Sequence, residues 1–175
     1  MHRLLLVLTL LAAPVIAGEA VPDFTFTDLR GNPRTLSQLQ SGSRPLMLVF
    51  WCSTCHSCRD AEARVDELRR EFAGKADVVA VDANRGESPE AVQAALDRKS
   101  LAFPVVFDSQ GRLADHFGIK ATTSTLLLDG QRNLRYLGSF GTPDQPLAQR
   151  ALEQLLAGGP VEPSRTKLRG CVIRR

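Results

Sequence analysis

The chain has 175 residues, a formal net charge of +3 and 23% charged residues. Five basic residues and one acidic residue lie in residues 162–175, so the rest of the chain is close to neutral. This composition argues against a nucleic-acid-binding protein, and after the N-terminal residues no segment is apolar enough to span a membrane.

The N-terminus has the features of a secretory signal peptide. A basic residue, Arg3, precedes an apolar stretch over residues 4–13, and small residues follow at Ala17 and Ala20. We therefore expect a signal peptide over residues 1–17, with cleavage after Ala17 or Ala20, and a periplasmic or secreted protein. The remaining ~155 residues suit a single domain, which we place at residues 21–158, followed by a basic tail over residues 159–175 that we expect to be a solvated extension.

In the first half of the chain, residues 22–39 predict a short strand, a turn at residues 31–33 and a helical turn. Residues 46–51 (LMLVFW) form a continuous apolar run, which is typical of a strand buried on both faces. Apolar residues then recur at intervals of three and four over residues 56–72, which predicts a helix.

The second half continues this alternation, with Ser88 and Pro89 as the N-cap and first position of a helix. Strands are predicted at residues 77–81, 103–107, 125–128 and 134–137, and helices at residues 88–96 and 142–156. Such a sequence favours an α/β fold, with a central mixed β-sheet flanked by helices.

Three of the four cysteines lie in WCSTCHSC, residues 51–58, between a predicted strand and a predicted helix. A disulfide-stapled scaffold would spread its cysteines along the chain, so this clustering indicates chemistry. The segment contains both C-x-x-C-H, the attachment pattern of haem c, and C-x-x-C, the pattern of a thiol-disulfide redox centre.

In the redox interpretation, Cys55 is the nucleophile, because free backbone amides and the helix dipole at the N-terminus of the helix stabilise negative charge. His56 would stabilise the thiolate further. Cys58 lies one helical turn later and would resolve the mixed disulfide by attacking Cys55. This chemistry needs no organic cofactor.

Three other interpretations are weighed beside it. In a c-type haem carrier, Cys52 and Cys55 would form thioethers and His56 would be an axial ligand. In a metallochaperone, Cys52, Cys55, Cys58 and His56 would hold Cu(I) or Zn(II). A peroxiredoxin-like peroxidase is disfavoured, because Val49 stands where that motif has a threonine hydroxyl.

Residues 21–59 (VPDFTFTDLRGNPRTLSQLQSGSRPLMLVFWCSTCHSCR) resemble the opening of TlpA/ResA-like and redoxin (AhpC/TSA-related) members of the thioredoxin superfamily. Phe50 and Trp51 match the family's F-W pair, which places Cys55 and Cys58 at its redox cysteines. Residues 103–119 and 125–141 also resemble later family segments. The resemblance implies a thioredoxin fold and a monomeric thiol-disulfide oxidoreductase that exchanges disulfides with protein thiols and receives electrons from a membrane thiol donor.

The sequence departs from that family where a substrate groove is expected. Thr123 stands at the position of the family's cis-proline, and we assign the groove to Trp51 and Thr123. A cis bond before a non-proline residue costs roughly 3 kcal/mol, so we expect a trans peptide at Thr123. The strand over residues 46–51 also lacks the acidic proton acceptor of some members, and Asp82 is a candidate replacement.

Two thiols have no assigned place in this scheme. Cys52 is surplus to the redox pair, and Cys171 lies in an RGCVI segment that resembles the C-terminus of some redoxin-like proteins. Three possibilities stay open: a Cys52–Cys171 disulfide that tethers the tail, a relay in which Cys171 attacks the active-site disulfide, and a free thiol.

Overall fold

The structure is a computed structural model that describes residues 20–175. The expected signal peptide over residues 1–17 lies outside this range. Between residues 20 and 175, none of the helices has the length and apolar character that crossing a membrane requires.

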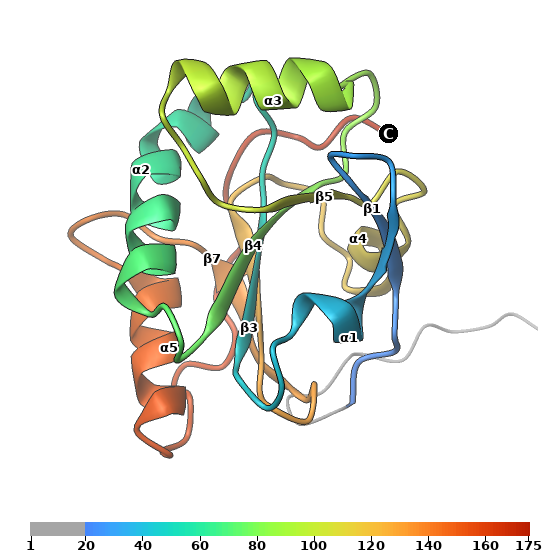
Figure 1. Cartoon of the computed structure of the whole chain (residues 1–175). Helices are drawn as coiled ribbons and strands as arrows, with labels where there is room; N and C mark the ends of the chain where they lie inside the picture. The colour runs from blue at the N-terminus through green and yellow to red at the C-terminus, as the bar shows by residue number, and fades with distance from the viewer. Residues whose placement is uncertain (1–19) are drawn as a thin grey trace, which may run out of the picture.

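The described strands form one seven-stranded mixed sheet in the order β2-β1-β5-β4-β3-β6-β7 (Figure 1). Their bounds are β1 Thr25–Asp28, β2 Pro33–Thr35, β3 Leu46–Phe50, β4 Asp77–Asp82, β5 Val105–Phe107, β6 Ser124–Leu128 and β7 Leu134–Ser139. The central strands β3, β4 and β5 are parallel, and β6 runs antiparallel to β3. All five residues of β3 are buried, because strands flank it and helices cover both of its faces.

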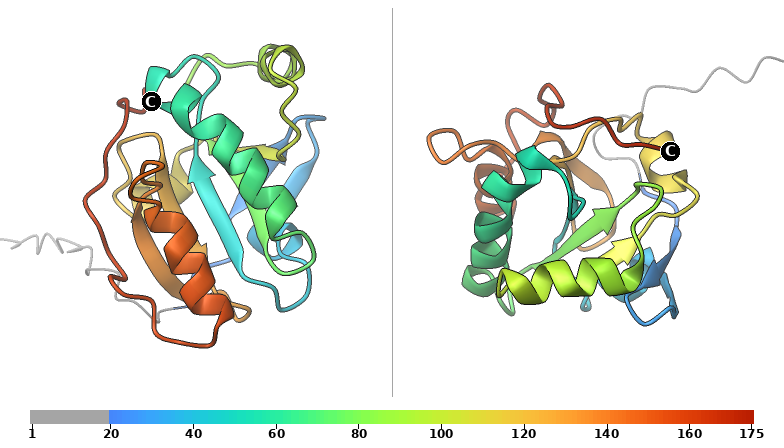
Figure 2. Two further views of the ribbon diagram at one scale, coloured as in Figure 1. Left: turned by 90° about the vertical axis from the view of Figure 1, so that its left-hand side faces the viewer. Right: turned by 90° about the horizontal axis from the view of Figure 1, so that it is seen from above.

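Helices cover the two faces of the sheet unequally (Figures 1 and 2). Their bounds are α1 Leu36–Leu39, α2 His56–Glu71, α3 Pro89–Arg98, α4 Arg112–His116 and α5 Leu147–Leu156. The apolar side chains of α2, α3 and α5 share one core cluster with one face of β3 and β4, and those of α1 and α4 share a second cluster with the other face. The predicted α/β class with a mixed sheet is confirmed.

The last helix is shorter than the sequence pattern predicts. The expected helix began at residue 142, whereas α5 begins at Leu147 with Pro146 as its N-cap. Proline lacks the N–H that a helix interior needs and disfavours helical geometry in the preceding residue. Thr142 and Gln145 instead close a turn, in which each backbone N–H donates to the other's carbonyl oxygen.

The C-terminal segment, residues 159–175, packs along the domain, so the expectation of a solvated extension is wrong. Val161 and Ile173 are 6% and 7% exposed, and the Thr166 hydroxyl lies 2.9 Å from the Tyr136 hydroxyl. Figure 2 shows this segment passing the N-terminal end of α2 and ending beside α4. A residue of the segment can therefore lie at the start of α2, where the cysteine cluster is.

Candidate active site

The cysteine cluster lies where the chain leaves β3 and enters α2. Cys55 is the N-cap of α2 and has an extended backbone conformation, and Cys58 lies within the first turn. The sulfur atoms of Cys52, Cys55 and Cys58 all lie within 4.8 Å of one another. Cys52 and Cys55 are each 5% exposed, and Cys58 is fully buried. All three are free thiols in the structure.

Cys52 and Cys58 form a hydrogen-bonded pair with opposite acid strengths. Hydrogen bonding from Cys58 lowers the pKa of the Cys52 thiol to about 6, against the effects of burial and of nearby Glu87. The same hydrogen bond, followed by burial, raises the pKa of Cys58. These shifts favour the proton on Cys58 and the negative charge on Cys52, which lies within 4.8 Å of the buried thiol.

Cys55 contacts the loop before β6. Its sulfur lies 3.1 Å from the hydroxyl oxygen of Thr122, a fully buried residue. Thr123 follows with a φ of 56°, a left-handed conformation that is uncommon for a β-branched residue. Its backbone N–H donates to the Phe50 carbonyl at 2.6 Å, and its carbonyl accepts from Phe140 at 2.7 Å. These two hydrogen bonds, to the end of β3 and to the residue after β7, hold the loop against the cysteines.

The peptide before Thr123 is trans, as expected; in the described residues the cis peptide is Glu162–Pro163. Thr123 lines a surface hollow of about 540 Å³ together with Ser57, Arg64, Arg169 and other residues of α2, the loop after β7 and the C-terminal segment. The hollow begins beside the first turn of α2, so a partner chain could rest there with its sulfur near the cluster.

Cys171 is brought to the start of α2 by the C-terminal segment. Its sulfur lies 3.4 Å from the Ser57 hydroxyl, and its backbone N–H donates to the Thr122 hydroxyl at 3.1 Å. Hydrogen bonds from Cys55, then from Ser57, and from the backbone N–H of His56 lower the pKa of the Cys171 thiol to about 7. The free amides at the N-terminus of α2 therefore support negative charge on Cys171.

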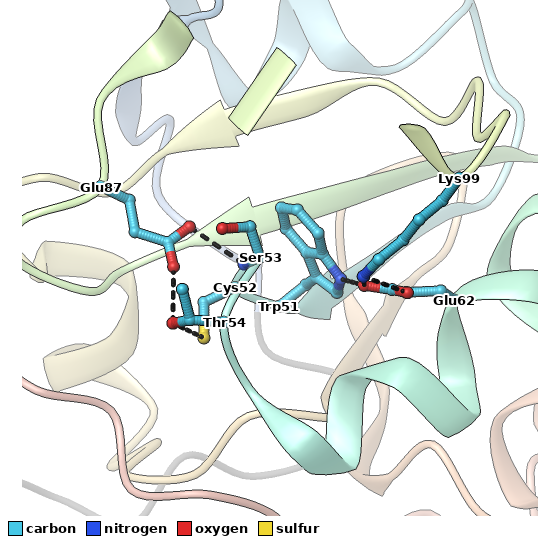
Figure 3. Close-up of polar contacts among 7 residues, drawn as sticks. All are labelled: Trp51, Cys52, Ser53, Thr54, Glu62, Glu87 and Lys99. Carbon is cyan, nitrogen blue, oxygen red and sulfur yellow. Dashed lines mark hydrogen bonds and ion pairs between the residues drawn. The ribbon is translucent and has the colours of Figure 1, made fainter. Parts of the chain in front are cut away.

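Trp51 is anchored beneath the site rather than facing solvent. It is 2% exposed, its ring meets Phe103 edge to face, and its indole N–H donates to Glu62 at 3.0 Å. Glu62, from α2, also pairs with Lys99 at 2.7 Å, as Figure 3 shows. The burial of Trp51 leaves little surface for a partner, so its assignment to a substrate groove is not supported by its position.

Glu87 holds the loop between the first two cysteines (Figure 3). Its carboxylate accepts from the Ser53 backbone N–H at 2.9 Å and from the Thr54 hydroxyl at 3.0 Å. Asp82, at the end of β4, is 1% exposed, and burial followed by repulsion from Glu87 raises its pKa to about 7. Asp82 thus interacts electrostatically with the residue that holds the cysteine loop, and its role as a proton acceptor stays a prediction.

The structure also bears on His56 and on the metal and haem alternatives. His56 is exposed at the first position of α2, and among the described residues the group that could hold a metal contains Cys52, Cys55 and Cys58 without it. The burial of Cys52 and Cys55 in the packed core counts against covalent attachment of a haem at these sulfurs.

Sequence reasoning missed four residues that shape the site: Ser57, Glu62, Glu87 and Thr122. Their contacts join segments between 11 and 114 residues apart in the chain, which no local pattern encodes. Only Thr122 could have been anticipated, because it lies in the loop before β6, which the expected fold brings against the redox cysteines.

The chain is similar to known proteins over most of its length. The thioredoxin-like protein YneN of Bacillus subtilis is 32% identical over 113 residues, which cover 64% of this chain and 65% of YneN. The thiol-disulfide oxidoreductase ResA of Geobacillus kaustophilus is 28% identical over 141 residues, which cover 81% of this chain and 79% of ResA. The chain thus spans just under two thirds of YneN. The crystal structure of the hypothetical protein SMc02350 from Sinorhizobium meliloti superimposes with a TM-score of 0.79 at 25% identity, over 91% of this chain and 94% of that one.

The fold and the paired cysteines at a helix start, together with these matches, define a thioredoxin-like thiol-disulfide oxidoreductase. The particular family follows from a second finding. The model of the AhpC/TSA family matches residues 17–137, and the chain belongs to that family.

Proposed function

We propose that the protein is an extracytoplasmic oxidoreductase that exchanges disulfides with protein partners through the Cys55–Cys58 couple. Cys55 forms a disulfide with an incoming sulfur, and Cys58 displaces that sulfur to close the Cys55–Cys58 disulfide. The observation that carries this proposal is the position of Cys55 at the N-cap and Cys58 in the first turn of α2, with sulfur atoms within 4.8 Å.

The surroundings of Cys58 support its part as the resolving thiol. A fully buried thiol with a raised pKa is a poor first nucleophile, because it stays protonated and out of a partner's reach. It must lose its proton when it attacks Cys55. Cys52, hydrogen-bonded to Cys58 and with a pKa of about 6, is the nearest base, and we assign it this proton.

The expected location and partners rest on the sequence and on the shape of the site. The signal-like residues 1–17 favour a periplasmic or secreted monomer that receives electrons from a membrane thiol donor. The hollow beside Thr123 is open to the surface and has Arg64 and Asp60 on its wall. A protein segment that carries a cysteine fits this surface better than an isolated small apolar molecule does.

The test is disulfide exchange by the purified protein and two variants. Reduced protein is mixed with a model protein disulfide such as insulin, and reduction is followed over time with a regenerating dithiol. Cys55→Ser and Cys58→Ser should both lose multiple turnover, since either change removes the closing disulfide. If Cys55→Ser turned over at the wild-type rate, the proposed function would be wrong. Loss of folding is separated from loss of chemistry by the tryptophan fluorescence of Trp51, which is the only tryptophan in the chain.

A second candidate function is the binding of Cu(I) or Zn(II) by Cys52, Cys55 and Cys58. It is favoured by the mutual distances of the three sulfurs, since thiolates about 2.3 Å from one metal ion lie about 4 Å apart. Equilibrium dialysis of the reduced protein against Cu(I) or Zn(II) separates the candidates. Retention of one ion per chain that is lost in Cys52→Ser would support a metal function. No retention would exclude it.

A further inference from the structure

Cys171 is the cysteine that a partner meets first. Cys55 and Cys52 are 5% exposed and Cys58 is fully buried, whereas Cys171 is partly exposed above them. Any exchange that begins by direct attack of Cys55 on a partner must first expose that sulfur. The same step at Cys171 requires no such exposure.

The chain holds Cys171 in place through its backbone. The Thr122 backbone N–H donates to the Cys171 carbonyl at 2.8 Å, and the Cys171 N–H returns to the Thr122 hydroxyl at 3.1 Å. Val172 pairs with Ala121 in an antiparallel bridge. The segment thus adds to the loop before β6 as an extended peptide does when it pairs with a strand edge.

The same Thr122 hydroxyl that accepts from Cys171 lies 3.1 Å from the Cys55 sulfur. One side chain therefore contacts both cysteine residues, and the interaction with Cys55 is the largest cause of the lowered pKa of Cys171. The hydroxyl of Ser57 and the backbone N–H groups of His56 and Ser57, at the N-terminus of the 16-residue helix α2, surround the Cys171 sulfur. These are the donors that stabilise a thiolate.

Gly170 makes this approach possible. Its φ is +153°, and a Cβ at this position would overlap the carbonyl oxygen of Thr122. A glycine is therefore required one residue before Cys171 for the segment to pack this closely. The geometry of Gly170 does not depend on the pKa of any thiol. It is therefore a separate argument that the segment with Cys171 packs against the loop before β6.

We infer that Cys171 is the entry thiol of the enzyme and passes disulfides between the partner and Cys55 through a Cys55–Cys171 disulfide. This inference rests on the proposed function, because it requires Cys55–Cys58 as the final couple. Of the three possibilities for Cys171, which are a tether, a relay and a free thiol, this inference selects the relay. Cys171 then forms a disulfide with Cys55 and not with Cys52.

The steps balance for reduction of a protein disulfide. The Cys171 thiolate attacks one partner sulfur, the partner S–S bond breaks, and its second sulfur leaves as a thiolate. Cys55 then attacks Cys171, which forms the Cys55–Cys171 bond and releases the first partner sulfur, which takes the Cys55 proton. Cys58 attacks Cys55, closes the Cys55–Cys58 disulfide and releases the Cys171 thiolate, and its proton passes to Cys52. Two electrons move from the Cys55–Cys58 dithiol to the partner disulfide.

Trapping variants test the order of these steps with oxidised glutathione as the probe. The reduced protein is exposed briefly to the probe, quenched with acid, alkylated and mapped by mass spectrometry. In Cys58→Ser, the product should be an internal Cys55–Cys171 disulfide. In Cys55→Ser, glutathione should be attached to Cys171. Glutathione on Cys55 in the Cys58→Ser variant, with Cys171 alkylated, would overturn the inference.

Kinetics distinguish this inference from the proposed function. Cys171→Ser should slow exchange at least about tenfold and abolish the rate increase centred near pH 7, the value for Cys171. Gly170→Ala, which keeps the thiol and displaces the segment, should slow exchange similarly. Gly74→Ala is the matched control, because Gly74 also has a positive φ and has open space around it, and it should exchange at the wild-type rate. If Cys171→Ser matched the wild type while Cys55→Ser and Cys58→Ser were inactive, the entry thiol would be rejected and the proposed function would stand.

Discussion

The buried carboxyl of Asp82 gives a sharp prediction about stability and pH. Asp82 is 1% exposed at the end of β4; its Oδ1 accepts from the Asn84 backbone N–H at 2.8 Å, while its buried Oδ2 has no partner among the described residues. Burial, followed by repulsion from Glu87, raises its pKa from the ordinary value of 3.8 to about 7. The folded protein therefore holds the Asp82 proton more tightly than the unfolded chain does.

The sign follows from linkage. An acid whose pKa is raised on folding favours the folded state fully below pH 3.8, and this contribution is lost as the pH rises through 7. A difference of about 3 pKa units corresponds to at most about 4 kcal/mol in the free energy of unfolding. Asp82→Asn removes this dependence, since the amide is neutral at every pH and has nearly the same shape.

The assay is urea unfolding of the reduced wild type and Asp82→Asn at pH 5 and pH 8.5, followed by Trp51 fluorescence. The gain in unfolding free energy on substitution should be larger at pH 8.5 than at pH 5, by up to about 3 kcal/mol, because about 2 pKa units separate pH 5 from the Asp82 pKa of about 7. Any constant cost of the amide cancels between the two pH values. Asp129→Asn is the control, because hydrogen bonds from Asn133 outweigh burial and lower the Asp129 pKa, so no such difference should appear. Equal effects of Asp82→Asn at the two pH values would refute the reasoning.

Three further substitutions have defined outcomes. Lys99→Met leaves the 4%-exposed Glu62 without its cation and should lower the free energy of unfolding by about 3 kcal/mol in urea titrations. Thr122→Val removes a hydroxyl that is hydrogen-bonded to the Cys55 sulfur in the reduced state, which should lower the reduction potential by roughly 20 mV in a glutathione titration, for a bond worth about 1 kcal/mol. Ser88→Ala removes the N-cap of α3 and should cost about 1 kcal/mol in thermal or urea unfolding.

The sequence was sufficient for most strands of the sheet and for the clustering of three cysteines at a helix start because both depend on local patterns. The continuous apolar run predicts a buried strand, and Ser88-Pro89 predicts a helix start. The structure has β3 and the start of α3 at these places. The start of α5 was misplaced because the apolar spacing extends past Pro146, where the backbone cannot continue the helix.

The docked position of Cys171 could not be fixed by pattern reasoning, which left a tether, a relay and a free thiol open. Its partners Ser57 and Thr122 lie 114 and 49 residues away along the chain, and a basic C-terminal segment usually signals solvent exposure. The clue was Gly170, whose positive φ and close approach to Thr122 are visible only when both segments are in place. Cys52 was likewise unexplained until its hydrogen bond to Cys58 placed it next to the resolving thiol.

The central claim is that Cys55 and Cys58 form the redox couple of the resting oxidised enzyme. Disulfide mapping by mass spectrometry of the wild type, equilibrated across a series of glutathione ratios, tests it most directly. The account predicts that a Cys55–Cys58 disulfide appears as the protein is oxidised, with Cys52 and Cys171 alkylated as free thiols. A Cys52–Cys58 or Cys52–Cys171 disulfide as the main oxidised form would contradict it.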